Sequence, residues 1–495
     1  MEKVAITKLN EVYLKIDADS SIAKELNEYF SFQVPGYQFM PAYKMRMWNG
    51  KIYLFNLMGQ TLYGGLLEYL LDFCKTRGYE VELDSKIKVG KQVTQETLGV
   101  FLESLELPFE VRDYQKTAIL HAINTNRTLL LSPTGSGKSL MIYALTRYYK
   151  KKTLIIVPTI SLVSQMLADF KQYAKNDSSF SVDKQCKPIW GGKDKDASKM
   201  IVISTWQSIY KQPKHWFEQF EVVIGDEVHL FKAKSLTGIM TCLHNAKYRF
   251  GTTGTLDGTQ THKLVLEGLF GKVLPVTTTK KLMDDKQLAD LKIECLVLKY
   301  DDEFCKKAKK TKYHDEIKML VENEKRNAFI KNLAVNTKSN CLVLFQFVES
   351  HGKVLYEIIK EKAERLDPNR KVFFISGETE AEVREDIRQI VDKEKNAIIV
   401  ASSGVFSTGV NVRNLEHIIF ASPTKSRIKT LQSIGRTLRI GDNSDKAVLW
   451  DIVDDLSDKT YKNFAIKHFL ERIKIYNEEK FTYKLHKINL FENSK

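Results

Sequence analysis

The chain lacks the features that mark membrane, secreted or disulfide-stapled proteins. None of its apolar runs approaches the roughly 20 residues that a membrane-spanning helix needs. Its N-terminal residues have neither the apolar core nor the small-residue cleavage site of a signal peptide. Its six cysteines lie far apart without a C-x-x-C pair, which argues against a zinc site or a disulfide framework. We therefore expect reduced thiols, no membrane partner and a cytoplasmic location, the host cytoplasm if the protein is viral.

Internal repeats and low-complexity segments are also absent, so ordinary globular domains must account for the length. At 495 residues the chain is too long for one core, and two or three domains are expected. Positive charge is in excess, with a formal net charge of +15. The first 110 residues hold more acidic than basic side chains, so the excess lies beyond them. A basic surface suits a polyanion, because neutralised phosphates release counterions, although ordinary solubility charge is an alternative.

The order of apolar segments predicts an α/β protein. A small N-terminal α/β unit is followed by two series of short apolar, β-branched runs separated by amphipathic stretches. Such runs indicate parallel sheets covered on both faces. We expect a polar linker at 85–108. The predicted domains are an N-terminal accessory domain with its linker (1–108), two tandem sheet domains (109–285 and 286–458) and a basic C-terminal helix and tail (459–495).

The stretch LLLSPTGSGKS, residues 129–139, predicts a strand, a phosphate-binding loop and a helix. Glycines let backbone amides turn toward phosphate oxygens, while Lys138 can reach the terminal phosphates and the Ser139 hydroxyl can bind Mg²⁺. Ser132 replaces the usual first glycine, and a turn of small residues is the alternative. The expected nucleotide contacts are Pro133, Thr134, Gly135, Ser136, Gly137, Lys138 and Ser139.

An acidic pair follows a second apolar strand in EVVIGDEVH. At the end of a strand, Asp226 can hold Mg²⁺ and Glu227 can polarise the attacking water. Acidic pairs are common on surfaces, but this one follows a strand downstream of the loop.

A third motif, QSIGRTLR, contains Gln432, Arg436 and Arg439 near the end of the second series of strands. The two arginines lie three apart, so they share one face if this stretch is helical, and they could stabilise the charge of a transferring phosphate. A solvated basic helix is the alternative. Because the lysine and arginine motifs are far apart in sequence, a shared nucleotide would have to lie between two domains, and its hydrolysis would open and close them.

Together these stretches resemble motifs I, II and VI of superfamily 2 helicases. VRDYQ resembles the adenine-reading element, VPTISLVSQ motif Ia, ISTWQS motif Ib or Ic, TGT motif III, LVLFQFVESHG motif IV and SSGVFSTGVNV motif V. The order of the motifs and the stretch SFQVPGYQFMPAYKMRMWNGKIYLF resemble the UvsW-type helicases of T-even-type bacteriophages. The resemblance implies two RecA-like domains, and it implies nucleotide contacts by Arg112, Gln115, Gly409 and Asn411.

The resemblance also implies an activity: ATP- and Mg²⁺-dependent remodelling of branched DNA in recombination, replication and repair. For partners, we expect single- and double-stranded DNA and RNA in hybrids, and we expect the protein to be a monomer. Its DNA track would include Thr159, Ser161, Thr205, Ser208 and Thr408, whose hydroxyls can hold phosphates without reading sequence. For each lone hydroxyl, a turn or helix cap is the alternative. The residues alone predict only a nucleic-acid-dependent ATPase. An RNA helicase, the motor of a restriction enzyme and a non-enzymatic scaffold remain alternatives.

Two further stretches carry weaker predictions. In YKMRMWNGK, the side chains of Lys44, Arg46 and Trp48 alternate cation and aromatic, and the Asn-Gly pair predicts a tight hairpin. This tip could contact a DNA backbone or stack on a base, unless Trp48 packs into the domain core. The basic C-terminal segment predicts a packed closing helix, with nucleic-acid contact as a second interpretation.

Overall fold

The computed structural model describes residues 2–87, 92–192, 194–230, 233–256, 260–405, 412, 414–423, 426, 434, 446–458 and 460–491. The chain divides into two compact units, one formed by residues 1–277 apart from 133–136 and the other containing residues 278–495. Within the described part of the chain, no helix is long and apolar enough to cross a membrane.

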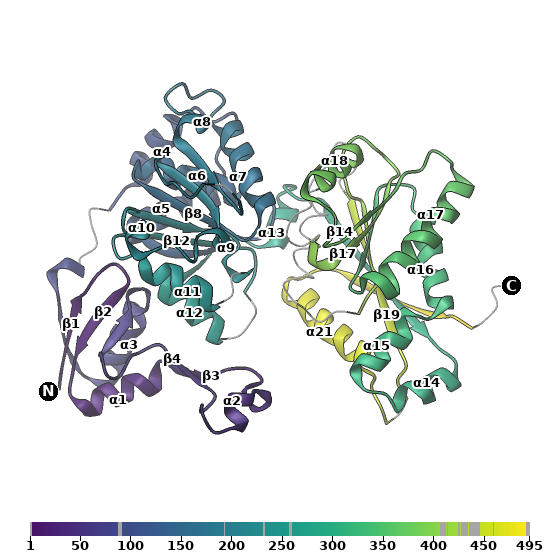
Figure 1. Ribbon diagram of the computed structural model, residues 1–495, viewed down its shortest axis with the longest axis horizontal. Coiled ribbons are helices and arrows are strands. Elements are labelled where there is room, and N and C mark those ends of the chain that lie inside the picture. The colour runs from purple at the N-terminus through teal and green to yellow at the C-terminus, as the bar shows by residue number, and fades with distance from the viewer. Residues whose placement is uncertain are drawn as a thin grey trace. The chain divides into compact units, whose positions relative to one another are not determined.

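The N-terminal domain (purple in Figure 1) is built on a four-stranded sheet of order β5-β2-β1-β6. Leu14 and Ile16 are the alternate apolar residues of β2, and both are buried. On α1, Ile22 and Leu26 are buried on one face of the helix. Gly78, with φ of +72°, ends α3. The elements are β1 (Lys3–Lys8), β2 (Tyr13–Asp17), α1 (Ser20–Tyr29), β3 (Ser31–Gln33), η1 (Tyr37–Phe39), α2 (Pro41–Lys44), β4 (Lys51–Tyr53), β5 (Thr61–Tyr63), η2 (Gly64–Leu66), α3 (Leu67–Arg77), β6 (Glu80–Leu83) and η3 (Ser85–Ile87).

Two expectations for this region differ from the structure. The predicted tight hairpin is wrong: β3 and β4 pair, but residues 34–50, which include α2, connect them. Gly50 adopts φ of +80° as the chain enters β4. The stretch 85–108 is not a plain linker, because it contains α4 (Gln95–Glu103), whose Leu98 and Leu102 pack into the core of the next domain.

The first large domain contains a seven-stranded, all-parallel sheet of order β13-β7-β12-β11-β8-β10-β9. Alternate residues of its central strands point to opposite faces of the sheet and pack into two separate hydrophobic cores. On β8, Ile155 packs with helices α5–α7, whereas Leu154 packs with helices α9–α12. The elements after α4 are α5 (Asp113–Thr125), β7 (Arg127–Leu131), α6 (Lys138–Tyr149), β8 (Thr153–Val157), α7 (Ile160–Tyr173), α8 (Val182–Gln185), β9 (Cys186–Ile189), β10 (Ile201–Thr205), α9 (Trp206–Ile209), α10 (Lys214–Glu218), β11 (Val222–Gly225), η4 (Val228–Leu230), α11 (Ala233–Cys242), β12 (Tyr248–Thr253), α12 (Gln260–Phe270) and β13 (Val273–Pro275).

The N-terminal domain packs directly on α12 and β7. The Tyr69 hydroxyl donates to Oε2 of buried Glu267 (2.9 Å), and Nη2 of Arg127, the first residue of β7, donates to the carbonyl of Glu11 (2.8 Å). Leu264 of α12 belongs to the apolar core of the N-terminal domain. The two domains therefore share buried contacts.

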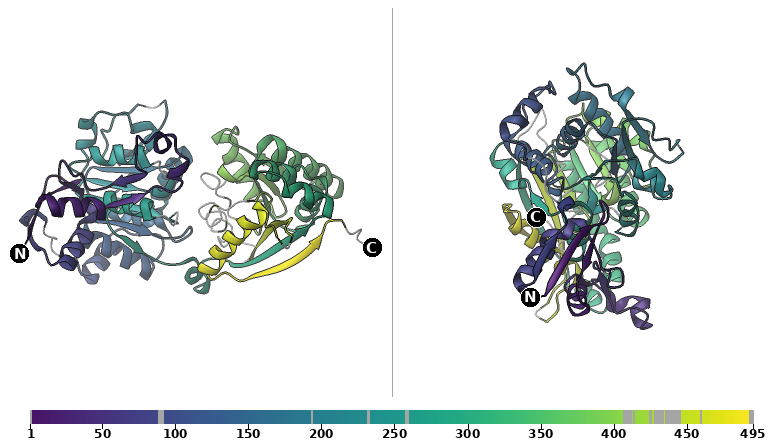
Figure 2. Two further views of the ribbon diagram at one scale, coloured as in Figure 1. Left: turned by 90° about the horizontal axis from the view of Figure 1, so that it is seen from below. Right: turned by 90° about the vertical axis from the view of Figure 1, so that its left-hand side faces the viewer.

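The second large domain repeats the architecture with a parallel sheet of order β16-β17-β15-β18-β19-β14-β20 (Figure 2). The closing helix α21 packs as expected, but the tail after it forms β20, a strand that the sequence analysis missed. The elements are α13 (Thr279–Asp284), β14 (Asp290–Lys299), α14 (Asp302–Lys309), α15 (Tyr313–Val321), α16 (Glu324–Asn336), β15 (Cys341–Phe345), η5 (Val348–Lys353), α17 (Val354–Leu366), β16 (Val372–Ile375), α18 (Ala381–Val391), β17 (Ile398–Ser402), β18 (His417–Phe420), β19 (Lys446–Asp455), α21 (Phe464–Glu478) and β20 (Tyr483–Asn489).

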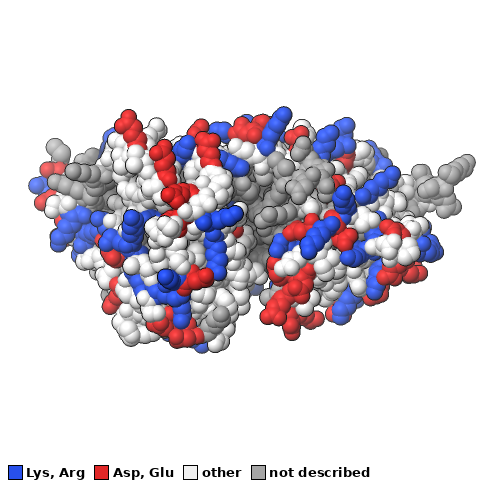
Figure 3. Space-filling view, turned by 90° about the horizontal axis from the view of Figure 1, so that it is seen from above, with Lys and Arg blue, Asp and Glu red and all other residues white. Residues whose placement is uncertain are grey.

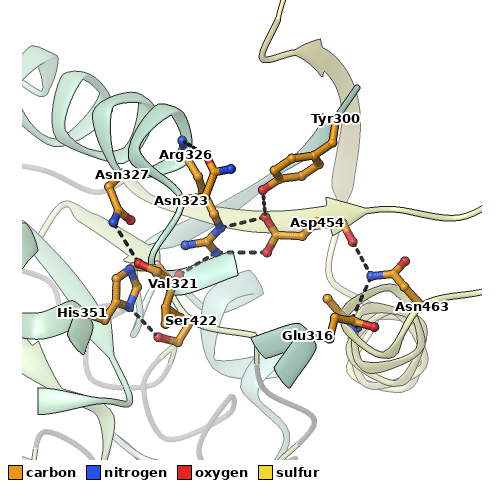
Figure 4. Close-up of polar contacts among 12 residues, drawn as sticks. Tyr300, Glu316, Val321, Asn323, Arg326, Asn327, His351, Ser422, Asp454 and Asn463 are labelled. Atoms are coloured by element: carbon orange, nitrogen blue, oxygen red, sulfur yellow. Dashed lines mark hydrogen bonds and ion pairs between the residues drawn. The ribbon is translucent and has the colours of Figure 1, made fainter. Parts of the chain in front are cut away.

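A buried polar cluster joins α16 to the carboxyl ends of three strands in this domain (Figure 4). The guanidinium of Arg326 donates from Nε and Nη2 to the two carboxylate oxygens of Asp454 (2.7 and 3.0 Å) and to the carbonyl of Ala421. The Tyr300 hydroxyl donates to the same carboxylate at 2.7 Å. Because each ion is buried, this pairing fixes how the helix sits on the sheet edge.

Candidate active site

The predicted phosphate loop lies at the carboxyl end of β7 and leads into α6. Gly135 and Gly137 have φ of +85° and +81°, which only glycine adopts without strain. A Cβ on Gly137 would lie 2.3 Å from Nε2 of Gln115. Ser132 does not share this need: its amide donates to the carbonyl of Thr253 at 2.8 Å and extends the pairing with β12. A side chain is tolerated there, which explains the departure from the usual glycine.

Lys138 connects the loop to the acidic pair. Its Nζ donates to the carbonyl of Ser132 (3.2 Å) and forms an ion pair with Oε1 of Glu227 (3.0 Å). The loop and the DEVH stretch, far apart in sequence, therefore meet at one edge of the sheet.

Asp226 and Glu227 are neighbouring carboxyls in different surroundings. Asp226 is buried and accepts from the Thr252 hydroxyl (2.6 Å) and the Glu227 amide (3.0 Å). Burial, reinforced by the charge of Glu227, raises the pKa of Asp226. For Glu227, burial acts in the same direction, but the positive charges of Lys138 and His229, together with hydrogen bonds from Lys138 and the Gly254 amide, outweigh it and lower the pKa. Glu227 also has φ of +49°, a strained backbone of the kind found at functional positions.

Motif III residues contact this pair. The Gly254 amide donates to Oε2 of Glu227 (3.3 Å), and Nδ1 of His229 lies 2.6 Å from the Thr253 hydroxyl. That hydroxyl donates its proton to the carbonyl of Thr255 (2.8 Å), so it accepts from His229. Three predicted motifs thus form one network of hydrogen bonds and ion pairs.

The adenine-reading pair begins α5. The Gln115 side chain is buried and accepts from the Arg112 amide (3.0 Å) as part of a capping box, while Nη1 of Arg112 donates to the Tyr114 hydroxyl (2.9 Å). Gln115 lies against the phosphate loop at Gly137, so the structure brings this predicted element to the loop.

The proposed Mg²⁺ ligands Ser139 and Asp226 flank the same loop. A hydroxyl with a carboxylate is a donor set that suits a hard cation, whose other ligands are usually water and phosphate oxygens. A cation would also favour the ionised form of Asp226, which burial and the charge of Glu227 disfavour. The residues therefore fit the ion. Ser139 Oγ lies 2.7 Å from the hydroxyl of Tyr173, a contact that the sequence analysis missed because Tyr173 ends α7 outside every motif.

The hydroxyls predicted for the DNA track are mostly engaged locally. The Thr159 side chain caps α7 by accepting from the Leu162 amide (3.3 Å), and Ser161 is half-buried. Thr205 and Ser208 are buried, with their hydroxyls 2.8 Å apart at the start of α9. These positions lie at the carboxyl ends of β8 and β10, but their roles in binding DNA stay predictions.

Six further predicted site residues lie outside the described residues. They are Thr408, Gly409 and Asn411 of motif V, and Gln432, Arg436 and Arg439 of motif VI.

The cation–aromatic stretch of the N-terminal domain forms a concave surface. Lys44, Arg46 and Trp48, together with Gln38, Tyr43, Met47 and Asn49, line a cavity of about 750 Å³. Trp48 is half-buried and donates from Nε1 to the Lys51 carbonyl (2.8 Å), whereas Lys44 and Arg46 are exposed. Arg46 adopts φ of +57°, which is unusual for a residue with a side chain. Elsewhere, on the face drawn in Figure 3, basic and acidic side chains are intermixed.

Comparison with known proteins adds family evidence. Three family models match: "DNA helicase UvsW, N-terminal" at residues 4–84, "Type III restriction enzyme, res subunit" at 108–258 and "Helicase conserved C-terminal domain" at 324–441. The ATP-dependent DNA helicase uvsW of Enterobacteria phage T4 is 36% identical, covering 97% of this chain and 98% of that protein. The DNA 3'-5' translocase XPB2 of Sulfurisphaera tokodaii is 27% identical over 75% of this chain and 87% of its own.

Solved structures agree. The crystal structure of T4 UvsW matches with a TM-score of 0.51 and 34% identity, covering 99% of this chain and all of that one. A fragment of a putative HsdR subunit of a Vibrio vulnificus type I restriction enzyme matches with a TM-score of 0.56 at 16% identity over 88% of this chain and 78% of that chain, a likeness of fold alone. The chain thus belongs to the UvsW family of helicases.

Proposed function

We propose that this protein is an ATP-dependent DNA helicase of superfamily 2 that remodels branched DNA by translocating along nucleic acid. The observation that carries the proposal is the network formed by Lys138, Glu227 and the motif III residues. The membership of the UvsW family supports DNA as the polymer.

The residues divide the work of hydrolysis. Lys138 and the loop amides bind the phosphates, and Glu227, kept ionised by Lys138, accepts a hydrogen bond from the attacking water. Ser139 and Asp226 would hold Mg²⁺, which when bound would neutralise charge on the phosphate oxygens. Gln115 fixes the base end of the nucleotide. The roles of Gln432, Arg436 and Arg439 in hydrolysis rest on the sequence.

The link from hydrolysis to DNA runs through motif III. Glu227 accepts from the Gly254 amide, and His229 contacts the Thr253 hydroxyl. A movement of the Glu227 carboxylate during hydrolysis would therefore shift the segment after β12. The concave surface of Lys44, Arg46 and Trp48 would bind the exposed bases or backbone at a branch point.

The test compares ATP hydrolysis and strand unwinding on single-stranded, duplex, forked and four-way DNA, and on matched RNA. The proposal expects DNA to stimulate hydrolysis and branched DNA to be unwound. Stimulation by RNA alone would favour the RNA-helicase alternative. Nicking of supercoiled DNA would favour the restriction motor, and a protein that bound DNA without hydrolysing ATP would be a scaffold.

A further inference from the structure

Lysines gather on the second large domain, away from every helicase motif. Residues 306–312, KKAKKTK, contain five lysines and no acidic residue at the end of α14 and just after it. Lys306, Lys309, Lys310 and Lys312 are exposed. A single charge run at the end of a helix is often only a complement to the helix dipole. Lys310 and Lys312, however, lie beyond the last residue of α14.

The start of α21 extends this cluster. Nζ of Lys309 binds the carboxylate of Asp458 (2.7 Å) and the Thr460 hydroxyl (3.0 Å) in the loop before α21. The rings of Tyr313 and Phe464 pack edge to face at 5.6 Å. These contacts bring the start of α21, with exposed Lys462 and Lys467, near the α14 lysines. We call Lys306, Lys309, Lys310, Lys312, Lys462 and Lys467 the duplex-arm surface.

Charge is sorted between the two sides of α14. On the other side, a separate groove of about 470 Å³ is lined by more acidic than basic side chains: Asp301, Glu303, Glu322 and Glu324 against Lys307 and Lys325. On the lysine side, Asp458 is already paired with Lys309. A surface kept basic next to an acidic one favours a polyanion over general solubility.

The position of the surface fits a nucleic acid held by the same domain. In this parallel sheet, β14, β19, β15 and β17 have their carboxyl ends at one edge. Motifs IV and V follow β15 and β17, whereas α14 follows β14 and the Asp458 loop follows β19. Both contributing elements, α14 and α21, lie outside residues 324–441, the part that matches the general helicase C-terminal model.

We propose that the duplex-arm surface binds the phosphate backbone of a double-stranded arm of a branched DNA substrate. This inference rests on the proposed function and names where a second part of the substrate is held. Aromatic stacking favours single strands, but Tyr313 packs on Phe464 and His468, and Lys467 lies over the Phe464 ring. The surface offers six lysines but only one partly exposed ring, Tyr313, so contact with a duplex backbone is the better fit.

The experiment measures binding of the full-length protein to a four-way junction and to a single strand by fluorescence anisotropy over a range of salt. The test variant carries Lys306→Ala, Lys310→Ala and Lys312→Ala. The matched control carries Lys338→Ala, Lys393→Ala and Lys395→Ala, three exposed lysines just before β15 and β17 at the opposite edge of the same sheet. A further variant replaces the three test lysines by arginine, and thermal unfolding verifies that each protein is folded.

The proposal expects junction affinity to fall about tenfold or more at low salt in the alanine variant, with a salt slope smaller by about one for each phosphate that is no longer neutralised. Single-strand binding, the control variant and the arginine variant should match the parent. Unchanged junction binding, or an equal loss of affinity for the single strand, would overturn it. If the parent protein itself failed to hydrolyse ATP with DNA, the proposed function would fall instead, which separates the two failures.

Discussion

Nζ of Lys138 lies 3.0 Å from Oε1 of Glu227, so the cation that would bind phosphate is the counter-ion of the carboxylate that would orient water. The positive charge of this lysine helps to keep the carboxylate ionised, because it lowers the pKa of Glu227. Phosphate oxygens entering the loop would compete with Glu227 for the ammonium, which ties nucleotide binding to the freedom of the carboxylate.

Lys138→Ala should reduce ATP hydrolysis by at least about a hundredfold, because it removes a phosphate contact aimed at the transition state. DNA binding should stay within about twofold, since Lys138 is not on a DNA-facing surface in the proposal. Steady-state phosphate release and anisotropy measure the two effects. Lys150→Ala, at the other end of α6, is the control. Hydrolysis at the parent rate would refute the site.

Asp226→Asn should abolish hydrolysis yet stabilise the protein in the absence of nucleotide. Because its pKa is raised, Asp226 holds a proton more readily when folded than when unfolded, so stability is lost as pH rises from the ordinary carboxyl pKa through the raised folded pKa. Asparagine keeps an acceptor for Thr252 without that cost. Thermal midpoints should therefore be higher in the variant at pH 8 and converge with the parent at pH 4. A lower midpoint at pH 8 would contradict this.

Thr253→Val should separate hydrolysis from unwinding. It removes the hydroxyl that accepts from His229 and donates to the Thr255 carbonyl, while keeping the size of the side chain. DNA-stimulated hydrolysis should persist within a few-fold, and forked-DNA unwinding should fall about tenfold. Thr255→Val is a matched control, because the buried Thr255 hydroxyl has no hydrogen-bond partner in the described structure. Equal losses in both variants would argue against a coupling role.

Replacing Lys44 and Arg46 by alanine and Trp48 by leucine should weaken binding to forked DNA at least about fivefold, because two cations and a stacking surface are removed together. ATP hydrolysis without DNA should not change. Met58→Ala, at an exposed site of the same domain, controls for a general surface effect. If forked-DNA affinity stays at the parent value, Trp48 has a packing role only.

Arg326→Met should cost about 3–5 kcal/mol of unfolding free energy, because it leaves the Asp454 carboxylate buried without its cation. Denaturant unfolding measures the loss. Lys325→Met, on the exposed neighbour that lies over the Phe491 ring, should cost about 1 kcal/mol or less. Tyr300→Phe should lie between them, since it removes one hydrogen bond to the same carboxylate.

Sequence reasoning succeeded where local pattern determines structure. The two series of β-branched runs predicted two parallel sheets, which the structure contains, and Lys138 and Glu227, both predicted to act on one nucleotide, form an ion pair. It failed where tertiary contacts decide. Residues 85–108 look polar, yet α4 is helical because Leu98 and Leu102 find an apolar surface to cover.

Other misses have the same origin. The Asn49-Gly50 pair is typical of a tight hairpin, but β4 and its partner β3 are connected by seventeen residues, 34–50, which include two short helices. The hydroxyls of Thr205 and Ser208 gave no sign that they would bond to each other. Contacts of this kind depend on the tertiary structure, and no periodic pattern in the sequence predicts them.

Glu267 connects the N-terminal domain rigidly to the first large domain. One carboxylate oxygen accepts from Tyr69 of the N-terminal domain, and the other accepts from the Val273 amide at the start of β13. A force on the N-terminal domain would therefore be transmitted through Glu267 to β13, the edge strand of the sheet. Removing residues 1–83 would expose the buried Glu267 carboxylate and the apolar side of α12. We therefore expect the N-terminal domain and the first large domain to fold as one unit.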